Sequence, residues 1–330
     1  MATKVREQFA VATPNSSHPN PLISHEKLRQ LYSMMLKCRL LEERARILEK
    51  KAGESDHYSS IGLEATAVGA AVDLRPADTL APWRRDFILN YLKGVPLTAM
   101  FSELYCRDTR PHHGNSVPGD CGYAPLNIVL PASAVATPFE RCVDIALANQ
   151  RKRNDNVAMV FRGEDSIFLG EWHDALKFAG QRRLPVVFVR QNNPPAVSVP
   201  LNLEGPGDAI STAAADYGFP AITVDGKDAV AMYRVAQEAI ERARSGGGPT
   251  LIEAQSLPEY EPTQIDHAHF RTTDRVEKLE SRDPITFMER YLTGKGLFSE
   301  GWKNEIIAAF EQELDAAIYN AEIDTCGASA

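Results

Sequence analysis

The sequence has no apolar run of about 18 residues, the length that a membrane-spanning helix needs, and its first residues lack the apolar core of a secretory signal. Its five cysteines have no C-x-x-C spacing, which predicts reduced thiols and not a disulfide framework or a zinc site. No block of Lys and Arg occurs, and the net charge is −8. We therefore expect a cytoplasmic protein that uses neither nucleic acid nor a membrane as partner.

What the chain does have is enough apolar content for one large α/β domain, with 44% hydrophobic residues in 330. Residues 1–22 are polar and contain Pro14, Pro19 and Pro21, which predicts a flexible N-terminal arm. Residues 23–330 are predicted to form a single domain, with a C-terminal helical extension over 302–321.

Two helices are expected in the N-terminal part of this domain. Apolar residues recur at steps of three and four over 24–51, with Ser24 as N-cap and Gly53 as the stop. Residues 62–74 form a second helical pattern, rich in small residues that allow close packing. Residues 105–127 show no periodicity and predict a long loop.

The second half of the chain alternates between strands and helices. Strands are predicted at 157–161, 185–189, 221–225 and 250–254, with helices over Trp172–Ala179 and 227–244 between them. This order is typical of an α/β fold with a parallel sheet and helices on both of its faces.

Polar residues follow two consecutive strands of this sheet. Gly163, Glu164 and Asp165 come after the first strand, and Asn193 follows the next one. Ligands of open parallel sheets bind beyond the carboxyl ends of the strands, and carboxylate and amide oxygens suit Mg²⁺, which bridges to phosphate. A helix starting near Gly170 adds its positive end. The alternative is that both segments are ordinary polar turns.

At these residues the sequence resembles the alpha subunit of the thiamine diphosphate-dependent 2-oxo acid dehydrogenases of the pyruvate, branched-chain and acetoin types. The family's thiamine motif opens with G-D-G or G-E-G and closes about thirty residues later with N-N, as does "GEDSIFLGEWHDALKFAGQRRLPVVFVRQNN" here. The resemblance covers roughly residues 24–320 and includes "GLEATAVGAAVDL", "NIVLPASAVAT", "ITVDGKDAVAMY", "RARSGGGPTLIEA" and "RDPI".

The resemblance implies a thiamine diphosphate-binding fold, with thiamine diphosphate and Mg²⁺ as cofactors and a structural K⁺ as a further candidate. It makes Glu164, Asn193 and the backbone carbonyl of Pro195 the metal ligands, with Asp165 as an alternative ligand. It places Arg85 on the diphosphate. It sets Ser133 and Thr137 in the segment that contacts thiamine or K⁺.

The implied reaction is oxidative decarboxylation of a small 2-oxo acid, with acyl transfer to the lipoyl group of an acyltransferase. In the family a beta subunit completes the site, so the resemblance implies a heterotetramer of two alpha and two beta chains.

The sequence departs from the family at several of these positions. Asp165 replaces a glycine, and a carboxylate about 4 Å from a phosphate charge costs roughly 4 kcal/mol at an effective dielectric near 20. Either metal ligation by Asp165 or neutralisation by Arg84 or Arg162 would offset that cost. Arg84 itself stands where the family has tyrosine.

The family's H-S pair, in the loop after the strand at 250–254, is missing. His267 and His269 lie nearby and are the candidate catalytic residues, although they are also typical of exposed loop histidines. Two alternatives to an active enzyme of the known types therefore stay open. One is a catalytically degenerate family member that serves as a binding or scaffolding subunit, and the other is a rewired thiamine enzyme of a specialised pathway.

Overall fold

A computed structural model describes most of the chain. The described residues are 23–52, 59–83, 87–105, 123–129, 137–163, 170–192, 217–255 and 283–327. The predicted N-terminal arm and the stop at Gly53 lie outside them. Within the described residues, no helix is long and apolar enough to cross a membrane.

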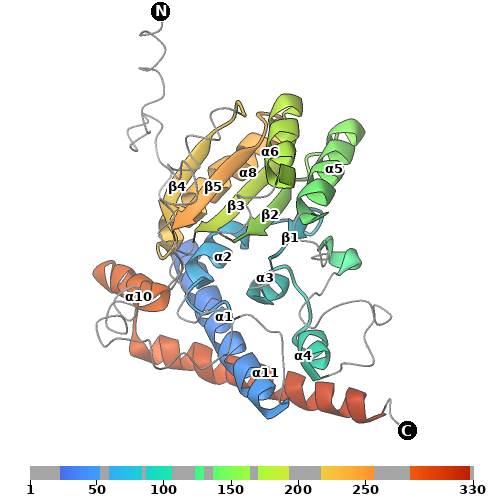
Figure 1. Ribbon diagram of the computed structural model, residues 1–330. Coiled ribbons are helices and arrows are strands. Elements are labelled where there is room, and N and C mark those ends of the chain that lie inside the picture. The colour runs from blue at the N-terminus through green and yellow to red at the C-terminus, as the bar shows by residue number, and fades with distance from the viewer. Residues whose placement is uncertain are drawn as a thin grey trace, which may run out of the picture.

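A five-stranded, fully parallel sheet forms the centre of the fold, in the order β1-β2-β3-β5-β4 (Figure 1). The strands are β1 (Thr79–Ala81), β2 (Ala158–Arg162), β3 (Val186–Asn192), β4 (Ala221–Asp225) and β5 (Thr250–Gln255). The predicted parallel sheet is confirmed, with bounds that move by up to three residues. β1 was not predicted, because three residues are too few to show a periodicity.

Helices α5 (Thr137–Lys152) and α6 (Gly170–Arg182) cover one face of the sheet. Their buried residues pack against alternate residues of the strands, such as Val160 and Phe188. Trp172 lies at the centre of this layer, with its ring centroid 4.8 Å from that of Phe139 and 5.7 Å from that of Phe188. The start of α6 at Gly170 is as predicted.

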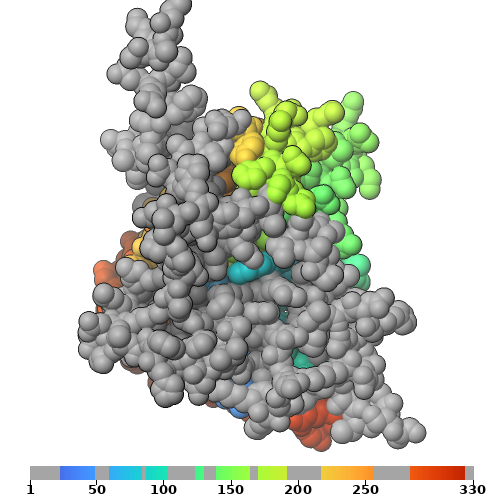
Figure 2. All heavy atoms as spheres, in the orientation of Figure 1, coloured from blue at the N-terminus to red at the C-terminus, as the bar shows by residue number. Residues whose placement is uncertain are grey.

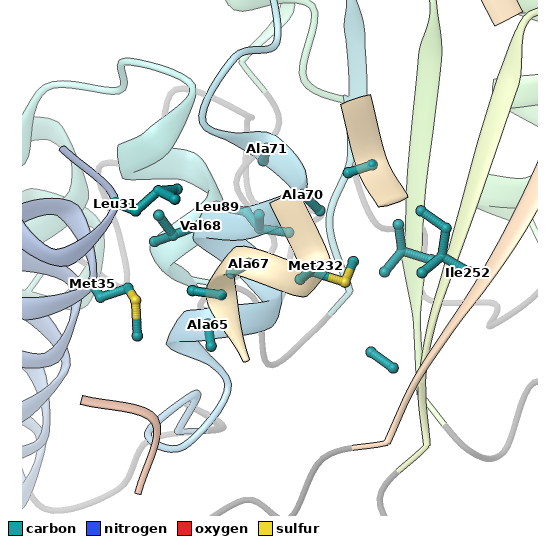
Figure 3. Close-up of a cluster of buried hydrophobic side chains, with 14 of the residues drawn as sticks. Leu31, Met35, Ala65, Ala67, Val68, Ala70, Ala71, Leu89, Met232 and Ile252 are labelled. Atoms are coloured by element: carbon teal, nitrogen blue, oxygen red, sulfur yellow. The ribbon is translucent and has the colours of Figure 1, made fainter. Parts of the chain in front are cut away.

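The opposite face packs against more helices and includes the largest buried cluster. These helices are α1 (His25–Ala52), α2 (Glu64–Ala71), α3 (Phe87–Leu92), α8 (Ala229–Arg244) and α10 (Pro284–Gly294). Figure 3 shows the alanines of α2 between Leu31 and Met35 of α1 and Met232 of α8. A Cβ atom on Gly69 would lie 2.8 Å from Cβ of Met232, so small residues in α2 do allow close packing. Helices therefore cover both faces, which confirms the predicted architecture.

Local signals set several helix ends. Ser24 caps α1, since its hydroxyl accepts a hydrogen bond from the amide of Lys27 at 3.1 Å. Asp228 caps α8 by accepting hydrogen bonds from the amides of Val230 and Ala231. The predicted helices over 24–51 and 227–244 are thus confirmed with nearly unchanged bounds.

The remaining helices form a layer away from the sheet. α11 (Glu300–Gly327) packs on α1 and α4 (Leu97–Tyr105) through a third buried cluster that includes Phe101, Phe310 and Leu314. Figure 1 shows α11 along the bottom of the molecule, and in Figure 2 its red surface lies opposite the green surfaces of α5 and α6. The predicted C-terminal helix exists and is longer than 302–321. Within the predicted loop over 105–127, Tyr105 is the last residue of α4 and Ala124–Leu126 form a short 3₁₀ helix; the residues between them lie outside the described ones.

Candidate active site at the carboxyl edge of the sheet

The two strands that carry the predicted metal ligands are neighbours. β2 pairs with β3 in parallel, with Arg162 level with Arg190, so both strands end at the same edge of the sheet. Gly163 follows β2 directly and precedes Glu164, while Asn192 ends β3 and precedes Asn193. The structure therefore meets the condition on which the sequence-based metal site depends.

Two predicted site residues lie within the described part of the chain. Gly163 is buried at the carboxyl edge, and Thr137 is the first residue of α5. The other predicted site residues lie outside the described residues: Arg85, Ser133, Glu164, Asp165, Asn193, Pro195, His267 and His269. Their roles stay predictions.

The carboxyl ends of β1 and β5 lie at the same edge. β1 ends at Ala81, two residues before Trp83, and the segment that contains Arg84 and Arg85 follows. β5 ends at Gln255, level with Asn192 of β3, and the segment that contains His267 and His269 follows. All predicted site residues except Ser133 and Thr137 therefore belong to segments that follow one of four parallel strands. These segments all start from the same edge of the sheet.

A buried charged row lies just inside this edge. Arg162, Arg190 and Glu253 are register neighbours on β2, β3 and β5, and all three are buried. Arg190 and Glu253 form an ion pair of 2.7 Å, and the guanidinium carbon of Arg162 lies 4.7 Å from the centroid of the Phe139 ring. The row therefore brings two arginines and one glutamate of the described chain to the carboxyl edge.

The helix starts beside this row add to its positive potential. Phe139 belongs to the first turn of α5, and α6 starts at Gly170, a few residues after Gly163. The amino end of a helix carries a partial positive charge and attracts anions. The sequence suggested Arg162 only as a counter-charge for Asp165 and no role for Arg190, although a charge at the end of the apolar run of β3 was a visible signal.

A second buried charged cluster joins helices on the opposite face. Arg39 of α1 donates to Glu64 of α2 at 2.5 Å and to Asp283, the N-cap of α10, at 2.7 Å. Burial raises the pKa of Glu64, with Arg39 opposing that rise. Burial also acts to raise the pKa of Asp283, but Arg39 and the hydrogen bonds from Thr286 outweigh it and lower this pKa. Sequence reasoning assigned no role to this triad.

The described residues contain no group of three or more His, Cys, Asp or Glu side chains that could hold a metal ion. A cavity of about 340 Å³ lies between α1 and α11, lined by residues such as Leu40, Ile47, Leu314 and Ile318. It belongs to the helical layer away from the sheet edge. The carboxyl edge, with its buried cations, remains the candidate site.

Comparison with known proteins defines the class to which this fold and edge belong. The family model of the dehydrogenase E1 component matches residues 32–326, so the chain is a member of that family. Among its relatives is the 2-oxoisovalerate dehydrogenase subunit alpha of Bacillus subtilis, 32% identical over 89% of this chain and 92% of the relative. The pyruvate dehydrogenase E1 component subunit alpha of Staphylococcus aureus is 29% identical over 92% of this chain and 80% of the relative. The family resemblance seen in the motifs is confirmed.

Proposed function

We propose that the chain is the alpha subunit of a thiamine diphosphate-dependent 2-oxo acid dehydrogenase. Its reaction would be the oxidative decarboxylation of a 2-oxo acid, with acyl transfer to a lipoyl group. The observation that carries this proposal is the pairing of β2 with β3, because these are the two strands that Glu164 and Asn193 follow in the sequence and both end at one edge. The relatives' names, which describe alpha subunits of 2-oxo acid dehydrogenases, point the same way.

The described residues fit a phosphate-bearing cofactor. A diphosphate needs positive charge and backbone that can approach closely, and the edge offers the Arg162–Arg190 row, the start of α6 and Gly163. Thiamine diphosphate, when bound, supplies the electron sink that decarboxylation of a 2-oxo acid requires.

The chain's own residues would bind and orient that cofactor. Glu164, Asn193 and the carbonyl of Pro195 would hold Mg²⁺, as hard oxygen ligands do. Arg85 would hold the diphosphate, and Ser133 and Thr137 would contact thiamine or a structural K⁺. His267 and His269 are our candidates to move a proton near the substrate.

A beta subunit would complete this site in a heterotetramer of two alpha and two beta chains. Support comes from the relatives' designation as alpha subunits, which implies a second kind of subunit. A lipoyl-bearing acyltransferase would be a further partner. The scattered cysteines, of which Cys38 and Cys142 are buried and free, fit a reducing cytoplasm.

Calorimetric titration of the chain, purified with its beta subunit, with thiamine diphosphate and Mg²⁺ tests the proposal. We expect saturable binding that E164A and N193A abolish, because each removes a metal ligand. E238A is the matched control, since Glu238 is an exposed carboxylate on α8, and it should bind as the wild type does. Absence of saturable binding at millimolar cofactor would instead favour the degenerate, scaffolding role.

The variant D165G tests how the altered motif works. Because Glu164 is the proposed ligand, Asp165 places an extra negative charge near the diphosphate, and its removal should tighten binding. The tightening should reach at most about a thousandfold, the equivalent of roughly 4 kcal/mol. Weaker binding by D165G in the same titration would assign the metal to Asp165.

A further inference from the structure

Trp83 lies against the first glycine of the motif. A Cβ atom on Gly163 would lie 2.2 Å from Cη2 of Trp83 and 2.6 Å from both Cζ2 and Cζ3. No real Cβ atom approaches another carbon so closely, so the tip of the indole occupies the space that any other residue at 163 would need. Gly163 thus permits the packing of Trp83, quite apart from any approach to phosphate.

This contact lies on one particular side of the sheet. Side chains alternate along β2, and Phe161 belongs to the cluster under α1, α2 and α8, whereas Val160 belongs to the cluster under α5 and α6. Gly163 therefore faces the first cluster, against which Trp83 also packs, and Arg162 faces the second. The indole therefore fills the α1 and α2 side of the edge at β2.

The contact also fixes where the chain runs after β1. β1 pairs with β2 and ends at Ala81, and only Pro82 separates it from Trp83. With the indole held against Gly163, the backbone at position 83 is tied to the end of β2. Arg84 and Arg85 are the next two residues in the sequence. An extended chain spans at most about 3.5 Å per residue from this point.

We propose that Trp83 is a positioning residue of the carboxyl edge: its indole, held against Gly163, fixes the point from which the segment with Arg84 and Arg85 starts, and so helps Arg85 to bind the diphosphate. This inference deepens the proposed function and rests on it for the identity of the ligand. Trp83 acts through the arginines and needs no contact with the cofactor of its own.

The first experiment measures affinity in the complex with the beta subunit, with thiamine diphosphate and Mg²⁺ as the probe. W83A should weaken binding about tenfold or more, and W83F, which keeps a ring against Gly163, should restore it to within about threefold of wild type. R85A should weaken binding strongly in the wild type and only slightly further in W83A, because the arginine is already misplaced there. Additive effects of W83A and R85A, or wild-type affinity of W83A, would overturn the proposal.

W302F is the matched control for the loss of an indole. Trp302 packs near Tyr32 on the α11 side, with ring centroids 5.3 Å apart, and should not affect binding. Thermal unfolding of every variant separates the two roles. A merely structural Trp83 would lower the melting temperature of W83A and leave its affinity unchanged.

Two further arms separate this inference from the proposed function. In the ligand-free chain, G163A should destabilise the wild type far more than it destabilises W83A. Equal effects would show that the indole of Trp83 does not pack against Gly163. Titration with Mg²⁺ and inorganic diphosphate is the second arm. Binding of diphosphate without binding of the thiamine cofactor would overturn the proposed function and leave the role of Trp83 measurable, whereas binding of neither would overturn both.

Discussion

At the scale of single residues, burial next to the candidate site changes the chemistry of Cys142. This thiol lies on α5, is fully buried, and belongs to the cluster between α5, α6 and the sheet. Burial raises its pKa to about 12, although the positive charge of Arg162 acts in the opposite direction. A thiol with such a pKa is not a nucleophile at neutral pH, so Cys142 is a packing residue and not a catalytic one.

This raised pKa predicts a loss of stability at high pH. Below pH 9 the thiol is protonated in both the folded and the unfolded chain; between pH 9 and about 12 only the unfolded chain ionises, which favours unfolding. Ionisation of Cys142 should therefore lower the free energy of unfolding by an amount that approaches about 4 kcal/mol near pH 12. Urea unfolding at pH 8, 9.5 and 11 measures it, with C142A as the control. An equal fall for C142A and the wild type would contradict the prediction.

The residues of the site show how far a sequence alone can lead. The register of β2 and β3 confirms that the two strands preceding Glu164 and Asn193 are neighbours, which was inferable because spacing by one strand–helix–strand unit is a property of the sequence. The contact of Trp83 with Gly163 was not predictable, since it joins residues that follow two strands, β1 and β2, whose adjacency the sequence does not state. The ion pair of Arg190 with Glu253 was not predictable either, because the sequence does not state that β3 and β5 are neighbours.

At the scale of elements, the helices and strands with the longest hydrophobic patterns in the sequence were predicted best. The strands with four or more apolar or β-branched residues and the helices α1, α6, α8 and α11 were all foreseen. β1 and α3 were not, because three and six residues carry no usable period. α5 was also missed, although Phe139, Cys142, Val143 and Ala146 lie at helical spacing and are buried in the structure. Helix α2 was foreseen, and its small residues set the distance to α8.

The close packing of α2 on α8 predicts an unusual response to alanine. Alanine normally stabilises a helix relative to glycine by up to about 1 kcal/mol, but a Cβ atom on Gly69 would lie 2.8 Å from Cβ of Met232. Overpacking should outweigh that gain, so G69A should destabilise the chain by about 1 to 3 kcal/mol in urea unfolding. G301A on α11 is the control, because no atom lies within 4 Å of its added Cβ, and it should be neutral or slightly stabilising. Equal effects of the two would refute close packing.

At the scale of the whole molecule, the sheet and the helices that surround it are joined by buried polar contacts as well as by apolar packing. Arg39 connects three helices that are far apart in sequence, α1, α2 and α10, through Glu64 and Asp283. Asp283 is also the first described residue after the segment that holds His267 and His269. The triad therefore fixes the point at which the described chain resumes, at the start of α10.

Removal of Arg39 should accordingly affect the whole fold. R39M leaves two carboxylates without their shared cation, Glu64 fully buried and Asp283 largely so, and a broken buried pair typically costs about 3 to 5 kcal/mol. R44M is the matched control: Arg44 pairs with Asp315, whose side chain is 65% exposed, and exposed pairs contribute less than about 1 kcal/mol. Urea unfolding should give a large loss for R39M and little for R44M. Since the cost comes from uncompensated charge, the triple variant R39M/E64Q/D283N should regain part of it; a triple variant no more stable than R39M would show that Arg39 acts through packing alone.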